Sequence, residues 1–247
     1  MKVRRLNRKI TGFAVLLSAT SLFAGGSVTG TVKFIGKAPQ MKAINRQMAA
    51  DPLCAAQHQD APVRTEWLVA GENGELKNVY VYVKEGLEGQ EFSSPESAAT
   101  IDQNGCIYIP HVLGIQVGQP IEILNSDGTL HNVHALPKVK GNDAFNVAMP
   151  GMRKKITKKF DVPEVMIKIK CDVHPWMGAY VGVLDHPYFS VTDDSGTYTI
   201  EGLPPGNYTL EAWHERLKTL TVTVTIKGDE AVEANFNFKR PEKKKDE

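Results

Sequence analysis

Most of this chain alternates apolar and polar residues with a period of two, between residues 28 and 238. The run NVYVYVK at 78–84 and the run LTVTVTI at 220–226 show the pattern most clearly. Successive side chains of a strand point to opposite faces of a sheet, so this alternation is typical of strands with one buried face. Glycine and proline separate the runs, as in DSG at 194–196 and PPG at 204–206. The sequence therefore predicts an all-β protein with one short helical piece at 43–58.

The first 24 residues have a different composition. Basic residues at positions 2, 4, 5, 8 and 9 precede an apolar run at 10–23, and the small residues Ala24, Gly25 and Gly26 follow. This order is that of a secretory signal peptide cleaved after Ala24, so we expect a periplasmic or secreted protein with no stable membrane span after cleavage. Cleavage leaves 24 basic against 28 acidic residues, a balance that argues against a nucleic-acid partner.

Export also determines how the three cysteines are interpreted. An oxidising compartment allows two of them to pair, and we expect a disulfide between Cys54 and Cys106. Cys171 is then the unpaired cysteine. It stands in KIKCDVHPWMGAYVGV at 168–183, where His174 and Met177 follow it at intervals of three residues. A thiolate, an imidazole and a thioether are ligands that a mononuclear copper site draws from one loop, with a second imidazole from elsewhere.

Strand phase supports an inward thiol. Val165, Ile167 and Ile169 alternate with Met166, Lys168 and Lys170, and the apolar phase continues onto Cys171. On an earlier run, His131 is in phase with Val133, whereas His134 must face the other side of a regular strand.

The stretch from Thr100 to Leu184 resembles the cupredoxins, the Greek-key β-barrels of plastocyanin, pseudoazurin and amicyanin. The resemblance lies in YIPHVLGIQVGQPIEILNSDGTLHNV, at Tyr108, Pro110, Gly118, Asn125, His131, Asn132 and Val133, and in the closing hairpin around Cys171. It implies one copper ion held by His131, Cys171, His174 and Met177. By analogy with plastocyanin, His111 would lie toward the barrel end away from the metal, in a surface or structural role.

The metal loop departs from plastocyanin in one respect. Only Pro175 and Trp176 separate His174 from Met177, where plastocyanin has four residues. Proline stiffens this short path, so Met177 is expected to be the weakest ligand. A dinuclear centre would need a second loop cysteine, and Asp172 and Val173 are not cysteines.

The stretch SVTDDSGTYTIEGLPPGNYTLEAWHE at 190–215 resembles the carboxypeptidase regulatory-like domain, a transthyretin-like β-sandwich. The opening GSVTGTVKFIGKAP at 26–39 resembles the first strand of the same fold, which predicts a sandwich split around the copper domain. The predicted divisions are a signal peptide at 1–24, the first part of the sandwich at 25–94, the copper domain at 95–186, the second part of the sandwich at 187–239 and a charged tail at 240–247.

The cupredoxin resemblance implies a one-electron carrier with a redox partner such as a periplasmic cytochrome. No nucleophile, phosphate loop or paired-carboxylate motif indicates an enzyme. Two alternatives stay open: a periplasmic protein that binds or delivers copper through an accessible site, and a structural or carbohydrate-binding accessory module. The basic run MRKKITKKF at 152–160 is either a solvated hairpin or a docking surface for an acidic partner.

Overall fold

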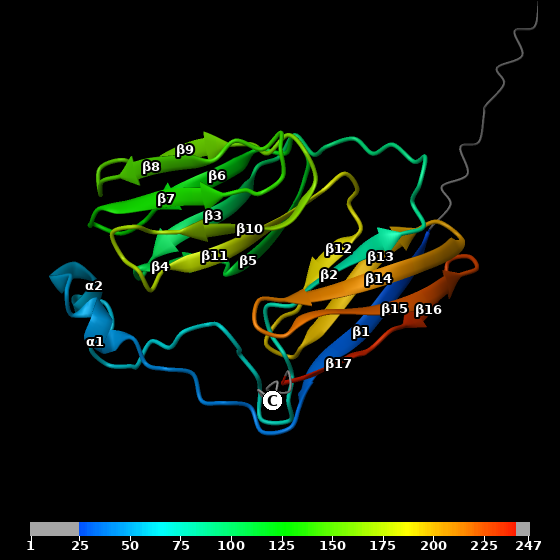
Figure 1. Cartoon of the computed structure of the whole chain (residues 1–247), viewed down its shortest axis with the longest axis horizontal. Helices are drawn as coiled ribbons and strands as arrows, with labels where there is room; N and C mark the ends of the chain where they lie inside the picture. The colour runs from blue at the N-terminus through cyan, green and yellow to red at the C-terminus, as the bar shows by residue number, and fades with distance from the viewer. Residues whose placement is uncertain (1–24, 241–247) are drawn as a thin grey trace, which may run out of the picture.

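The computed structural model describes residues 25–240, so the predicted signal peptide and residues 241–247 of the predicted tail lie outside it. Within this range the chain folds into strands with two short helices, and the all-β prediction is confirmed. The strands form two bodies that lie side by side (Figure 1). Neither helix in the described part of the chain has the length or apolar content to cross a membrane.

The first body, here called the central domain, consists of two facing sheets with the strand orders β5-β11-β10-β7-β8 and β4-β3-β6-β9. Its core contains residues from both sheets, including Ile101, Val133, Ile167 and Cys171. The sheets are not joined into one closed hydrogen-bonded barrel among the described strands. The strand bounds are β3 (Ala99–Asn104), β4 (Ile107–Ile109), β5 (Val112–Gln116), β6 (Ile121–Asn125), β7 (His131–Leu136), β8 (Phe145–Met149), β9 (Lys155–Lys158), β10 (Glu164–Lys170) and β11 (Gly178–Leu184).

The second body is a sandwich whose strands come from both sides of the central domain in the sequence. One sheet has β1 between β13 and β16, with β17 also paired to β1, and the other has the order β12-β2-β14-β15. The predicted split of the sandwich is therefore confirmed. The bounds are β1 (Gly26–Ile35), β2 (Tyr80–Glu85), β12 (Phe189–Val191), β13 (Thr197–Leu203), β14 (Gly206–His214), β15 (Lys218–Ile226), β16 (Ala231–Glu233) and β17 (Phe236–Lys239).

The two bodies pack through an apolar cluster between β5 and β11 on one side and β2 and β12 on the other. Gly114 and Gly182 lie opposite each other in the β5–β11 pair. A Cβ at Gly114 would come within 2.5 Å of the Phe189 ring, and one at Gly182 within 2.7 Å of the Tyr80 ring. These two glycines therefore let the aromatic rings of the sandwich rest directly on the sheet of the central domain.

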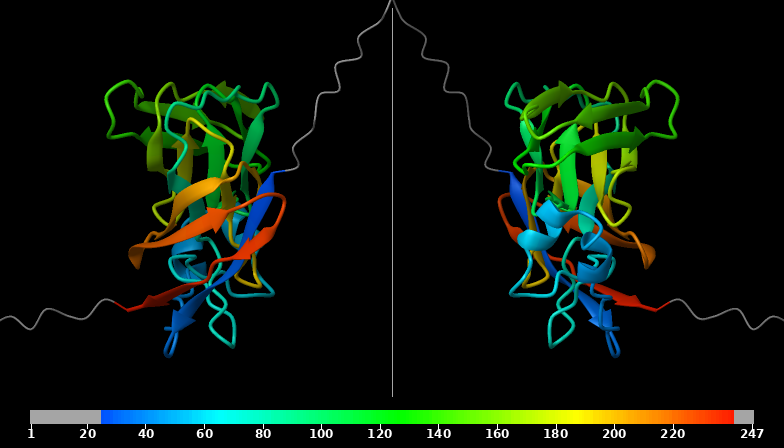
Figure 2. Two further views of the ribbon diagram at one scale, coloured as in Figure 1. Left: turned by 90° about the vertical axis from the view of Figure 1, so that its right-hand side faces the viewer. Right: turned by 90° about the vertical axis from the view of Figure 1, so that its left-hand side faces the viewer.

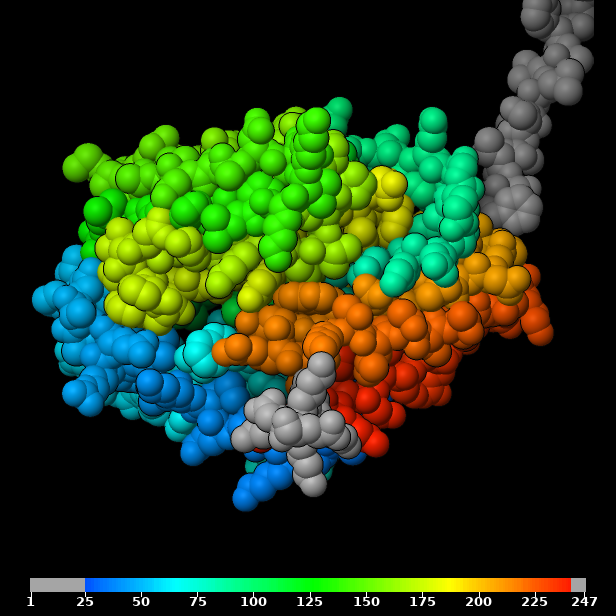
Figure 3. Space-filling model, viewed as in Figure 1, coloured from blue at the N-terminus to red at the C-terminus, as the bar shows by residue number. Residues whose placement is uncertain are grey.

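A short helical cap, defined as residues 45–57, contains α1 (Asn45–Met48) and α2 (Pro52–Ala56). Sequence analysis places it in the first part of the sandwich, but its buried residues pack on the central domain. Ile44, Met48 and Cys54 form a small cluster with Cys106, against which Trp176 packs. Figure 2 (right) shows the cap in front of the central domain. In Figure 3 the blue cap lies against the yellow-green end of that domain, which contains the residues around position 170.

Strand β10 is less regular than its sequence suggests. Met166 has a positive φ of 66° and the pairing with β11 shifts between Glu164 and Ile167. This bulge leaves Val165 exposed at 37% and turns Met166 into the cluster between the two bodies. The predicted inward phase is therefore wrong for Val165, whereas Ile167, Ile169 and Cys171 all lie in the core.

Candidate metal centre

Three side chains predicted as ligands meet at one end of the central domain. His131 begins β7, Cys171 directly follows β10, and His174 lies in the loop between β10 and β11. One ligand atom from each lies within 4.8 Å of the others. The two Nδ1 atoms of His131 and His174 are 2.8 Å apart, and the Cys171 sulfur is 3.9 Å from Nδ1 of His174. All three residues are buried, so the atoms face one another away from solvent.

The backbone around Cys171 favours a thiolate. The sulfur accepts hydrogen bonds from the backbone N–H groups of Asn132 at 3.5 Å and His174 at 3.3 Å. Burial raises the pKa of the Cys171 thiol, but the neighbouring His131 and these N–H groups lower it by more, so the net pKa is below its ordinary value. Cys171 is the free cysteine of the described chain.

A buried carboxylate orients His131. Its outer nitrogen, Nε2, lies 2.8 Å from Oδ2 of Asp127, and Asp127 also accepts hydrogen bonds from the backbone N–H groups of Gly105 and Cys106. Burial alone would lower the pKa of His131, but the bond to Asp127 and the charge of that carboxylate raise it overall. Sequence analysis missed Asp127. The only available signal was its position four residues before His131 in the turn after β6.

A second carboxylate orients His174, and it comes from the cap. Nε2 of His174 lies 3.1 Å from Oδ2 of Asp51, the residue that precedes helix α2. Burial and the nearby charge of His131 lower the pKa of His174 below its ordinary value, although the bond to Asp51 opposes this. No sequence pattern connects Asp51 to His174, which are 123 residues apart.

Met177 is the fourth predicted ligand. Its side chain is buried at 2% exposure in the same core cluster as Cys171. Its backbone N–H donates to the His174 carbonyl at 2.9 Å, and the Cys171 N–H donates to the Met177 carbonyl at 3.4 Å. The short loop is thus closed on itself, and the Met177 side chain lies in the core cluster that also contains Cys171.

This donor set suits copper. Imidazole nitrogens, a thiolate and a thioether are the ligand types from which electron-transfer copper sites are built. Each imidazole has its Nε2 bonded to a carboxylate, which leaves Nδ1 as the atom that faces the centre. Two further groups of potential ligands contain Cys54 or Cys106, whose sulfurs are joined to each other.

The disulfide between Cys54 and Cys106 is present in the structure, as expected from the sequence. It has an S–S distance of 2.04 Å and connects the cap to the turn between β3 and β4. The Cys54 sulfur also lies 3.8 Å from Nε2 of His174. The bond therefore holds the cap directly against the candidate centre.

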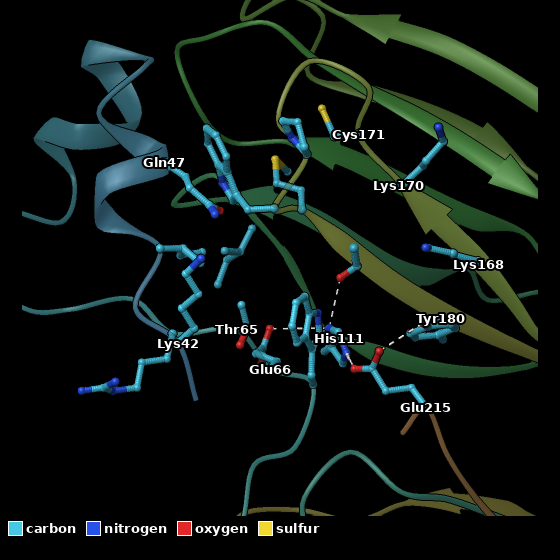
Figure 4. Close-up of a pocket in the computed structure, with 18 of the residues that line it drawn as sticks. Lys42, Gln47, Thr65, Glu66, His111, Lys168, Lys170, Cys171, Tyr180 and Glu215 are labelled. Carbon is cyan, nitrogen blue, oxygen red and sulfur yellow. Dashed lines mark hydrogen bonds and ion pairs between the residues drawn. The ribbon is translucent and has the colours of Figure 1, made fainter. Parts of the chain in front are cut away.

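His111 does not lie where the analogy with plastocyanin placed it. Its Nδ1 is 3.0 Å from the carbonyl oxygen of Gly178, the residue after Met177, and its Nε2 is 2.9 Å from Oε1 of Glu215 in the sandwich (Figure 4). The reason is the parallel pairing of β5 with β11, which brings the starts of both strands to the metal-loop end. His111 is only 7% exposed. Of the two expected roles, at the surface or structural, its burial favours the structural one.

A cavity of about 840 Å³ lies below the metal loop, between the cap, the central domain and the sandwich. Figure 4 shows Lys42 and Gln47 on its cap side and the group of Glu66, His111, Tyr180 and Glu215 on the other. The loop residues Trp176 and Met177 also line it.

Three lysines of the basic run at 152–160 make contacts within the protein. Lys155 pairs with Glu122 at 2.6 Å, Lys154 donates to the carbonyl of Asp127 at 3.0 Å, and Lys158 lies over the Phe145 ring. Most of the basic residues are nevertheless exposed, as in a solvated hairpin, and docking to an acidic partner stays a prediction.

Residues 173–239 match the family model of the carboxypeptidase regulatory-like domain. The match begins in the metal loop and continues to the end of the sandwich, and it confirms the resemblance found in the sequence. No curated protein matches the chain.

Solved structures that match part of this chain include cupredoxins. A purple cupredoxin from Nitrosopumilus maritimus is 25% identical over 34% of this chain and 98% of its own, with a TM-score of 0.29. A copper(I) form of an amicyanin variant is 20% identical over 42% of this chain and 97% of its own, with a TM-score of 0.32. A copper-containing nitrite reductase from Thermus scotoductus SA-01 is 22% identical with a TM-score of 0.33, over 40% of this chain and 25% of the reductase.

Proposed function

We propose that this protein is an exported mononuclear copper protein that carries single electrons. His131, Cys171, His174 and Met177 are the proposed ligands, with one copper ion per chain. The observation that supports this most strongly is the meeting of two imidazole Nδ1 atoms and a thiol sulfur in one buried place. Bound copper would supply a one-electron couple in a ligand set that suits both of its oxidation states.

The protein's own residues prepare this site in three ways. Asp127 and Asp51 hold the outer nitrogens of the two histidines, so each Nδ1 faces the centre. Backbone N–H groups stabilise the Cys171 thiolate. The cap packs against Trp176 of the loop. Rings and carboxylates held in place by such contacts need little rearrangement when charge changes at the centre.

The surface nearest the centre is suited to a redox partner. Leu53 of the cap and Val173 of the loop are exposed at 52% and 44%, and both line a shallow depression that also includes His174 and Pro175. We propose that a protein such as a periplasmic cytochrome contacts this apolar surface, because the proposed ligand His174 is one of the residues that line it.

Copper delivery is the second candidate function. A delivery site must release its metal to a chelator or an acceptor, whereas the three donor residues here are at most 3% exposed and the cap covers the loop. This burial favours the electron carrier. Slow exchange of copper with an excess of chelator is the result expected of a carrier.

The decisive test is the optical spectrum of the mature protein titrated with copper(II). A carrier of this kind is expected to show one equivalent of copper and an intense thiolate-to-copper charge-transfer band. Cys171→Ser removes the thiolate and should abolish that band. Asp172→Asn serves as the control, since Asp172 neighbours the site but bonds to His134 and Lys170 rather than to a proposed ligand nitrogen. A wild-type spectrum without a charge-transfer band would refute the proposed function.

A further inference from the structure

The cap encloses the edge of His174 that faces away from the proposed copper. Asp51 lies at the N-terminus of α2, and its Oδ2 is 3.1 Å from Nε2 of His174. Both partners are removed from bulk water, with side-chain exposures of 19% for Asp51 and 4% for His174. The imidazole is therefore held between the metal site on one side and a carboxylate on the other.

The two carboxylate oxygens of Asp51 have separate partners. Oδ1 accepts hydrogen bonds from the backbone N–H groups of Leu53 at 2.8 Å and Cys54 at 3.3 Å, which caps helix α2. Oδ2 accepts from the Thr129 hydroxyl at 2.7 Å and faces His174. The helix therefore determines which oxygen is directed at the imidazole.

The disulfide holds this carboxylate in place. Cys54 is three residues after Asp51, and its bond to Cys106 joins the first turn of α2 to the central domain. Both cysteines are fully buried, and the Trp176 indole N–H donates to the Cys106 carbonyl at 2.9 Å. The position of Asp51 relative to His174 is thus set by a covalent bond and not by a mobile surface loop.

We propose that Asp51 is a positioning residue that keeps the proton of His174 on Nε2 and makes the imidazole a stronger donor to copper(II) than to copper(I). This inference rests on the proposed copper function. A carboxylate that accepts the outer N–H of a ligand imidazole selects its tautomer and raises its basicity. A more basic ligand stabilises the more highly charged ion, so Asp51 lowers the reduction potential of the site.

Asp51→Asn is the sharpest substitution because asparagine caps helices as well as aspartate does. Its single carbonyl oxygen is needed by the N–H groups of Leu53 and Cys54, so its NH₂ group is directed at Nε2 of His174, where a donor meets a donor. Asp51→Ser retains a capping hydroxyl on a side chain too short to reach His174. It provides a second variant if the first does not fold.

The reduction potentials of the wild type, Asp51→Asn, Asp51→Ser and the control Asp172→Asn should be measured on copper-loaded protein. We expect both Asp51 variants to lose roughly tenfold in copper(II) affinity relative to copper(I), which for a one-electron couple is a rise of about 59 mV. Asp172→Asn removes the same charge without touching a ligand nitrogen and should shift the potential by less. Equal shifts in all variants, or none in the Asp51 variants, would overturn the proposal.

A measurement on metal-free protein separates this inference from the copper function. Nitrogen NMR of the imidazoles should show the Nε2–H tautomer of His174 in the wild type and its loss in Asp51→Asn. A wild type that keeps this tautomer but forms no coloured copper site would refute the proposed function and leave the positioning role of Asp51 intact. An unchanged tautomer in both Asp51 variants would refute the role of Asp51.

Discussion

Cys171 combines a buried position with contacts that stabilise a negative sulfur. It accepts hydrogen bonds from two backbone N–H groups and lies next to two imidazoles, and Asp127 raises the pKa of one of them, His131, despite its burial. A buried thiol without such neighbours would have a raised pKa. The surroundings of this residue therefore match those of a metal ligand better than those of a cysteine used only for packing.

Met177 is the proposed ligand whose role is easiest to isolate, because its side chain makes no hydrogen bond within residues 25–240 that a substitution would remove. Met177→Leu should retain a coloured copper site and raise its reduction potential, since an apolar axial neighbour disfavours copper(II). Optical titration followed by potentiometry measures both properties. If the spectrum and the potential both remain those of the wild type, the methionine only packs the loop and the site has three protein ligands.

The helical cap is the element that distinguishes this molecule from a plain pair of β domains. Its helices have four and five residues, too short to be stable alone. Its structure therefore depends on the disulfide, on the small cluster around Cys54 and Met48, and on the bonds from Asp51 and Gln57 to the metal-site end. The cap thus contributes a carboxylate and apolar contacts to the loop between β10 and β11, which is far from it in the sequence.

The disulfide gives a direct test of this element. Thiol titration of unfolded, metal-free protein should find one free thiol, that of Cys171. Replacing both Cys54 and Cys106 by alanine removes a cross-link across 52 residues, which in the chain-entropy model lowers the free energy of unfolding by roughly 4 kcal/mol. Urea unfolding measures the loss. Three free thiols, or an unchanged unfolding midpoint, would contradict the assignment.

In the whole molecule, the central domain and the sandwich meet at an ionic group beside their apolar interface. His111 of the central domain bonds Glu215 of the sandwich, and Tyr180 donates to the other oxygen of Glu215 at 3.1 Å. Glu66, on the segment between the cap and β2, has a carboxylate oxygen 3.7 Å from Nδ1 of His111. Both ring nitrogens of His111 thus face acceptors, which requires a doubly protonated ring when Glu215 is ionised.

This contact predicts a pH dependence of stability. Burial lowers the pKa of His111, but Glu215 and Glu66 raise it overall above its ordinary value of 6.5. The groups that face it are Glu215, Glu66 and Tyr180, with His214 and Arg216 nearby. Because the folded pKa is raised, the stabilisation is fully present below about pH 6.5 and is lost as the pH rises through the folded pKa.

The stability of the copper-loaded wild type is compared with that of copper-loaded His111→Gln. In both proteins, His131 and His174 then make the same contribution to the pH dependence of unfolding. The difference between their free energies of unfolding should be largest below about pH 6.5 and shrink as the pH rises through the raised pKa of His111. Denaturant unfolding at several pH values measures it. A difference that is constant across this range would show that His111 contributes through neutral hydrogen bonds alone.

Much of the fold follows from local pattern. Period-two alternation predicted the strands, and the two family resemblances predicted that a sandwich is split around a second domain. The alternation gave the wrong side for Val165, because the positive φ of Met166 creates a bulge that shifts the register. Side-chain periodicity does not reveal such a change in backbone conformation. The sequence predicted the cap as helical and grouped it with the sandwich, whereas it packs on the central domain, because short helices take their position from tertiary contacts.

Sequence alone identified the four candidate ligands. Close spacing in one loop pointed to Cys171, His174 and Met177, because these residue types together have a chemical meaning without a fold, and the cupredoxin resemblance pointed to His131. Asp127, Asp51 and the true position of His111 required the tertiary structure. Each acts through a partner on another element, and a lone carboxylate or imidazole has no periodicity that indicates which nitrogen or oxygen it will meet. Only strand pairing, the disulfide and the packing of the two bodies decide those distances.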